Sequence, residues 1–141
     1  MLEESSLYER VGGFDTILAV TRRWNELCLQ DPLAGHPFES GVHPRHNERL
    51  AAYLAEALNG PKLYTSGLGD ESSVQRIHAG NGIHIELDEA CLRLFDQAIA
   101  EAGISSEAAK QFSAYFRRAT NDMRIYAEVN NVPDGLPINL A

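Results

Sequence analysis

Apolar residues recur every three or four positions along most of this chain, and each such stretch ends near a glycine or a proline. That spacing puts the apolar side chains on one face of an α-helix. The alternation typical of a strand appears only at residues 83–86, which is too short to suggest a sheet. Helices are expected over residues 14–29, 44–59, 70–79, 88–102 and 106–130. The fold class predicted is therefore all-α, with short loops between amphipathic helices.

The composition excludes several classes of protein. Hydrophobic residues make up 44% of the chain and charged residues 23%, as in an ordinary globular domain. Twenty acidic residues against twelve basic ones give a net charge of −8, which repels phosphate backbones and anionic lipids. The start of the chain is acidic and polar, unlike a secretory signal. We expect a cytoplasmic protein without nucleic-acid or membrane partners.

One domain of residues 1–131 is expected, followed by an extended or partly mobile tail at 132–141. The tail begins with two prolines and a glycine within six residues, which disfavours a helix. Cys28 and Cys91 lie far apart in the sequence and form no CxxC or other metal-ligand spacing. The cysteines are therefore expected to be reduced and buried, and no structural zinc site is expected.

Two histidines fall on apolar faces of separate predicted helices. His46 lies four residues before Leu50 and shares its face, and His78 lies four residues after Val74. A flat, apolar, metal-centred ligand fits between two such helices. Haem needs this arrangement: an imidazole ligand on one side of the iron, a polar donor on the other, and apolar walls. A histidine on an apolar face is also a common core residue, so the pattern by itself leaves both interpretations open.

Several segments, taken in order, point to a known family. They are Leu7–Gly13, Asp31–Leu33, Phe38, Asn59–Tyr64 and Val74–His78. Together they resemble the truncated haemoglobins, most closely group II, over about residues 7–103. The resemblance implies a two-over-two helical sandwich around haem b, with His78 as the proximal iron ligand.

The resemblance also implies contacts with the haem, taken residue by residue. His46 matches the distal polar position, Phe38 the aromatic residue that packs on the porphyrin, and Tyr64 a position near a propionate. Leu50 and Tyr53 match apolar positions on the distal helix. The full set of expected cofactor-binding residues is His78, His46, Phe38, Leu50, Tyr53, Tyr64, Asn25, Cys91, Lys62 and Ile83.

The chain departs from the family pattern on the distal side. Many relatives carry a Phe-Tyr pair whose tyrosine donates to the bound oxygen, and Trp24-Asn25 stands there in this chain. Cys91 replaces the usual tryptophan of group II, which removes bulk and an indole N–H. A larger or less polar distal pocket is expected.

A further departure lies just before the proximal histidine, where an arginine is common in the family. Ile77 stands there in this chain, so it cannot bind a propionate. Lys62 and Arg76 remain as candidate propionate partners.

The expected function is reversible binding of dioxygen, nitric oxide or another diatomic ligand at the haem iron, including oxygen transport. One alternative is a haem enzyme, either a nitric oxide dioxygenase or peroxidase-like, which needs a separate reductase because this domain encodes no electron source. Another is a haem-free globin fold used for interaction or sensing. Within the expected function itself, a further alternative is that His46 coordinates the iron. Reversible ligand binding and haem catalysis need the same residues, so the sequence does not separate them.

Overall fold

A computed structural model of the chain describes residues 5–39 and 41–141, and every regular element in those ranges is helical. The all-α prediction is therefore confirmed. The acidic segment at residues 1–4, which suggested that no secretory signal is present, lies outside the described residues. The helices are α1 (Leu7–Val11), α2 (Gly13–Gln30), α3 (His36–Glu39), α4 (His46–Ala57), α5 (Glu71–His78), α6 (Ile85–Glu101), α7 (Ser106–Asp122) and the 3-10 helix η1 (Met123–Tyr126).

The predicted helices match the observed ones to within a few residues, with one clear exception. The last was expected to continue to residue 130, but α7 ends at Asp122 and the chain tightens into η1. Such 3-10 turns are frequent at the C-terminal ends of α-helices. The short helices α1 and α3 were not predicted, because one turn of helix carries too little periodicity to recognise.

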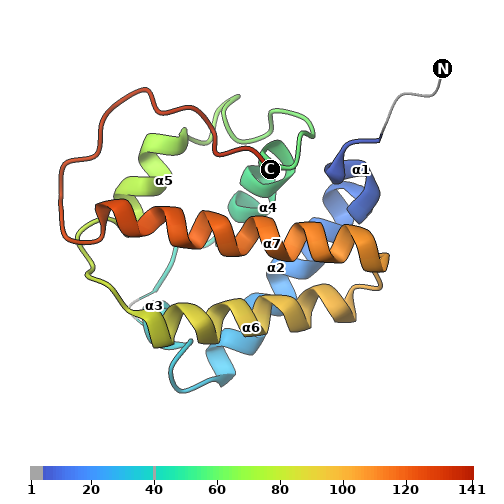
Figure 1. Cartoon of the computed structure of the whole chain (residues 1–141), viewed down its shortest axis with the longest axis horizontal. Coiled ribbons are helices and arrows are strands. Elements are labelled where there is room, and N and C mark those ends of the chain that lie inside the picture. Colours follow the sequence, from blue (N-terminus) through green and yellow to red (C-terminus); the bar gives the residue numbers. More distant parts are fainter. Residues whose placement is uncertain (1–4, 40) are drawn as a thin grey trace.

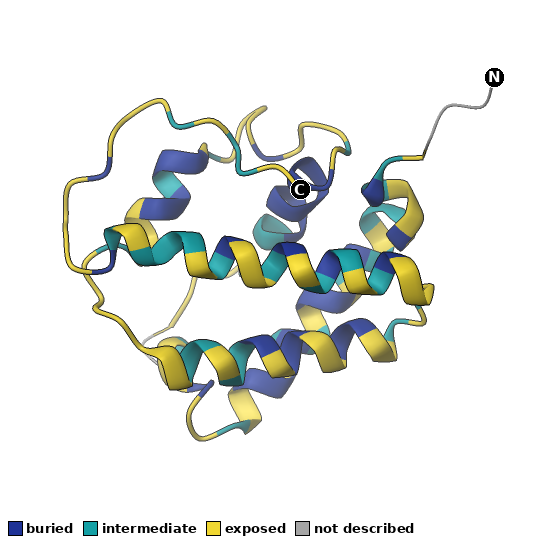
Figure 2. Cartoon of the chain, viewed as in Figure 1, coloured by how far each residue is buried: buried dark blue, intermediate teal, exposed yellow. Residues whose placement is uncertain are grey.

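The long helices form two layers. Figure 1 shows α6 and α7 running antiparallel across the front, with α2 and α4 behind them. The α2 helix packs against both α4 and α6, so it joins the layers. On α6 and α7, buried and exposed residues alternate around the helix axis, as expected of amphipathic helices (Figure 2). Within the described ranges, no helix combines the length and the apolarity that a membrane span requires.

An aromatic cluster centred on Trp24 joins the layers. The indole makes edge-to-face contacts with the rings of Phe38, Phe95 and Phe116, with centroid distances of 5.8, 5.7 and 5.5 Å. Phe95 and Phe116 stack on each other at 3.7 Å. These rings come from α2, α3, α6 and α7, so the cluster fixes the short α3 helix against the core.

The end of α4 meets α1 at a position that needs glycine. A Cβ atom on Gly60 would lie 2.5 Å from the ring of Tyr8 and 2.7 Å from the carbonyl oxygen of Ala55. The Tyr8 N–H donates to the Leu58 carbonyl at 3.0 Å, which holds the two segments together. Only a residue without a side chain allows this close approach.

After η1 the chain has no further regular structure and passes beside α5 to end near α4 (Figure 1). The Ala141 N–H donates to the carbonyl of Ala57 at 2.9 Å. The end of the chain is therefore held against α4.

Candidate functional site

His78 is the last residue of α5. The helix begins with a capping box: the Asp70 side chain accepts from Ser73 N at 2.8 Å, and Ser73 Oγ accepts from Asp70 N at 2.9 Å. His78 Nδ1 lies 2.9 Å from the carbonyl oxygen of Val74. Because a carbonyl can only accept, the proton is on Nδ1 and Nε2 keeps a lone pair. The side chain is exposed, so Nε2 is available to a metal ion.

His46 begins α4 and is half-buried. Its ring meets the Phe38 ring edge-on, with the centroids 5.7 Å apart. Its Nδ1 is buried without a hydrogen bond of good geometry, and so is the neighbouring Asn47 Oδ1. Burial lowers the pKa of His46, and the charge of His78 lowers it further, while the Asn47 side chain acts in the opposite direction. His46 is therefore neutral at pH 7.

The C-terminal half of α2 meets α6 at Trp24 and Cys91. Trp24 Nε1 donates to the Cys91 carbonyl oxygen at 2.9 Å. The indole is buried in the core beside Cys91, and its N–H is already occupied by that backbone carbonyl. Asn25, the next residue, is half-buried.

Both cysteines are free thiols, Cys28 buried and Cys91 half-buried. A hydrogen bond between the two thiols, together with burial, raises the pKa of Cys28. The same hydrogen bond lowers the pKa of Cys91. Cys91 is therefore the thiol of the pair that ionises first.

Apolar side chains close to His78 in the chain are exposed to solvent. Ile77 is 68% exposed, and Ile83 and Ile85 are 52% and 57% exposed. Leu50, one turn after His46 on α4, is half-buried and packs on the core. Exposed apolar residues close in the chain to an available imidazole are what a large apolar ligand would cover. The residues present therefore fit haem.

Tyr53 and Tyr64 are both buried, with their rings edge-to-face at 5.5 Å. The Tyr53 hydroxyl donates to Glu71 Oε1 at 2.6 Å. Burial, chiefly, raises the pKa of Tyr53, which keeps the hydroxyl protonated as a donor. Tyr53 thus links α4 to the first turn of α5. Glu71 was missed from the sequence, because an acidic residue in a first helical turn normally faces water.

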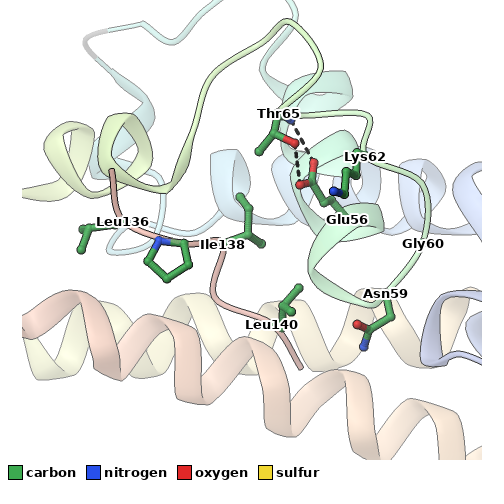
Figure 3. Close-up of a pocket in the computed structure, with 9 residues that line it drawn as sticks. Glu56, Asn59, Gly60, Lys62, Thr65, Leu136, Ile138 and Leu140 are labelled. Carbon is green, nitrogen blue, oxygen red and sulfur yellow. Dashed lines mark hydrogen bonds between the residues drawn. The ribbon is translucent and has the colours of Figure 1, made fainter. Parts of the chain in front are cut away.

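The two candidate propionate partners both lie beside the C-terminal segment. Arg76 donates to the Val132 carbonyl at 3.3 Å and forms an ion pair with Asp134. Lys62 borders a surface pocket of about 490 Å³ (Figure 3). The pocket is lined by Glu56, Asn59, Gly60, Lys62, Thr65, Leu136, Pro137, Ile138 and Leu140. The Glu56 carboxylate in this pocket already accepts hydrogen bonds from Thr65, from Oγ1 at 2.7 Å and from the backbone N–H at 2.9 Å.

Comparison with known proteins identifies the family. Residues 6–125 match the family model described as bacterial-like globin. The chain belongs to the bacterial-like globins. The family named from the sequence, the truncated haemoglobins, is thereby confirmed, as is the truncated globin fold.

Relatives of this globin carry the names of two groups. The chain is 27% identical to the group 1 truncated hemoglobin GlbN of Nostoc sp. (strain MUN 8820) over 117 residues, which are 83% of this chain and 92% of the relative. The group II 2-on-2 hemoglobin from Agrobacterium tumefaciens superposes with a TM-score of 0.74 at 26% identity, covering 87% of this chain and 96% of that one. The group II truncated hemoglobin from Bacillus anthracis, at 19% identity, shows the likeness of fold alone, with a TM-score of 0.77 over 95% of this chain and 97% of that one. The resemblance thus spans both groups.

Proposed function

We propose that this globin binds haem through His78 and reversibly binds a diatomic ligand, dioxygen or nitric oxide, on the side facing His46. The observation that carries the proposal is the hydrogen bond from His78 Nδ1 to Val74 O, which leaves Nε2 with its lone pair exposed. When bound, haem supplies the iron that takes up the diatomic ligand.

The partner of His78 favours binding over peroxide chemistry. A carboxylate on Nδ1 would push electron density onto the imidazole and favour cleavage of an O–O bond, whereas a backbone carbonyl does so less. In this chain the partner is the Val74 carbonyl, on the same helix as His78. The ligand is therefore expected to be released unchanged.

His46 supplies a polar group in an otherwise apolar region. The Nδ1 of His46 is buried and the Asn47 side chain acts on the ring, so Nε2 is the nitrogen left to meet a ligand. The lowered pKa keeps the ring neutral, so it holds one N–H that can donate. The contact with Phe38 limits how far the ring can turn.

Absorption spectra test the proposal. One equivalent of haem is added to the protein, and ferric and dithionite-reduced spectra are recorded for the unchanged chain, His78→Ala and His84→Ala. The control residue, His84, is also exposed, but it precedes α6 and its Nε2 contacts the Asn81 carbonyl. The Soret band is expected to be lost or strongly altered in His78→Ala alone. Failure of the unchanged chain to bind haem stoichiometrically, or identical spectra for all three proteins, would refute the proposal.

Two further measurements address the ligand. The reduced protein is expected to bind carbon monoxide reversibly, and His46→Leu is expected to retain haem but release dioxygen several-fold faster. The reduced spectrum also shows whether His46 binds the iron, because a six-coordinate haem gives sharp visible bands that His46→Leu would abolish.

A further inference from the structure

The helix that carries His78 has few helical neighbours. The helix that packs most closely against α5 in the described part of the chain is the short η1. The α5 helix has eight residues, and a helix this short is not stable by itself in water. Other contacts must therefore hold α5 in place, and the C-terminal segment runs beside it (Figure 1).

A buried carboxylate ties the first turn of α5 to its surroundings. Glu71 accepts hydrogen bonds from the Tyr53 hydroxyl at 2.6 Å, from Gln75 Nε2 at 2.7 Å and from the Asn139 N–H at 2.9 Å. The Tyr115 hydroxyl, from α7, donates to the carbonyl of the same Asn139 at 2.6 Å. Because a buried carboxyl group is costly without its hydrogen-bond donors, this cluster fixes α5 to α4 and, through Asn139, to α7.

The C-terminal segment also contacts α5 at two further residues. Ser72 Oγ donates to the Pro133 carbonyl at 2.7 Å and accepts from the Leu136 N–H at 3.1 Å. One turn later, Arg76 contacts the Val132 carbonyl and Asp134. The segment thus contacts α5 both in its first turn, at Glu71 and Ser72, and in its last turn, at Arg76.

The face that carries Ser72 and Arg76 is the one opposite the imidazole. Ser72 and Arg76 are four residues apart and share a face, as do Val74 and His78. The two pairs are offset by two positions, which is about 200° around a helix with 3.6 residues per turn. Ser72 and Arg76 are therefore held on the side of α5 away from His78. Glu71, seven residues before His78 and so about 20° from it around the axis, is held on the same side as His78 at the other end of the helix.

We propose that residues 132–141 form a C-terminal clasp that fixes α5, and that Glu71 and Ser72 are positioning residues for the His78 imidazole. The positioning role rests on the proposed function of His78 as a haem ligand. Groups that orient a metal-binding histidine tune its bond to the metal, and the clasp does so through the whole helix. A loosened clasp lets α5 move and weakens that bond.

Two readouts on the full-length chain test the clasp, with Ser72→Ala and the isosteric Glu71→Gln as variants. The matched control is Ser113→Ala, which removes a serine hydroxyl that contacts Asp96 between α7 and α6, away from α5. Amide hydrogen exchange is measured with and without haem. We expect exchange in α5 to become at least tenfold faster in both variants, while α2 stays within twofold and the control is unchanged.

The second readout is the iron–histidine stretching band in the resonance Raman spectrum of the reduced haem protein. It is expected to shift in Ser72→Ala and Glu71→Gln and to stay in place in Ser113→Ala. Unchanged exchange in α5, or an equal increase in every helix, would overturn the clasp. Faster exchange with an unmoved band would overturn the positioning role. If the unchanged chain takes up no haem, both the proposed haem-binding function and the positioning role of Glu71 and Ser72 fail. Amide exchange in the haem-free protein still decides whether the clasp exists.

Discussion

Replacing Trp24 tests how much the aromatic cluster between the two helical layers contributes to the stability of the fold. The indole contacts three aromatic rings and donates one hydrogen bond to Cys91. Trp24→Ala removes all four interactions and leaves a cavity, whereas Trp24→Phe keeps a ring and loses the N–H donor. Leu29→Ala is the matched control, because Leu29 lies on the same helix and is 57% exposed.

The expected magnitudes follow from those contacts. Truncating a buried tryptophan to alanine costs about 3–5 kcal/mol. A hydrogen bond contributes roughly 0.5–1.5 kcal/mol, so Trp24→Phe, with its smaller packing loss, is expected to cost about 1–2 kcal/mol. The exposed control, Leu29→Ala, is expected to stay within about 0.5 kcal/mol. Since domains are stable by about 5–15 kcal/mol, the alanine variant loses a large part of its stability.

Urea unfolding of the haem-free protein, followed by far-UV circular dichroism, measures these differences. Fluorescence is unsuitable because Trp24 is the sole tryptophan of the chain. Haem is left out because a ligand that binds only the folded state adds to the apparent stability. The reasoning is refuted if Trp24→Ala costs less than about 1 kcal/mol, or no more than Leu29→Ala, with an unchanged denaturant slope.

Two more predictions concern single contacts. The pKa of His46 is lower in the folded protein than its ordinary value of 6.5, so the unfolded chain binds more protons as the pH falls through that value. The free energy of unfolding of the haem-free protein is therefore expected to decrease below about pH 6.5, until the pH falls below the pKa of His46 in the folded protein. In urea titrations, His46→Leu is expected to show a flatter dependence of this free energy on pH. Parallel pH profiles for the unchanged chain and His46→Leu would contradict this. Gly60→Ala places a Cβ atom against Tyr8 and is expected to cost about 1–3 kcal/mol in the same assay. Gly67→Ala, where nothing lies within 4 Å, is the control, and an equal loss in both would disprove the steric account.

Local features of the fold were predictable from the sequence because their causes are local. Helical spacing gives the extent of α2, α4 and α6, and the Asp70 cap gives the start of α5. The same spacing puts His46 and Leu50 on one face of α4. The contact of His78 with Val74 is also local, since it spans one turn of helix.

The positions of side chains relative to distant segments required the tertiary structure. Glu71 has the sequence signature of an exposed first-turn residue, and only its donors from α4 and the C-terminal segment explain its burial. Trp24 fills the space beside Cys91 because α2 crosses α6 there. Lys62 lies at a surface pocket that residues of the C-terminal segment help to line.

The sequence by itself determined where the long helices lie and which of their faces are apolar, because periodicity and caps act over a few positions. The order of several short segments along the chain pointed to the truncated-globin family. The tertiary structure alone decided how α5 is held. Ser72 and Glu71 meet their partners across more than sixty positions of chain. Such contacts depend on how the whole chain packs, and no local pattern encodes their partners.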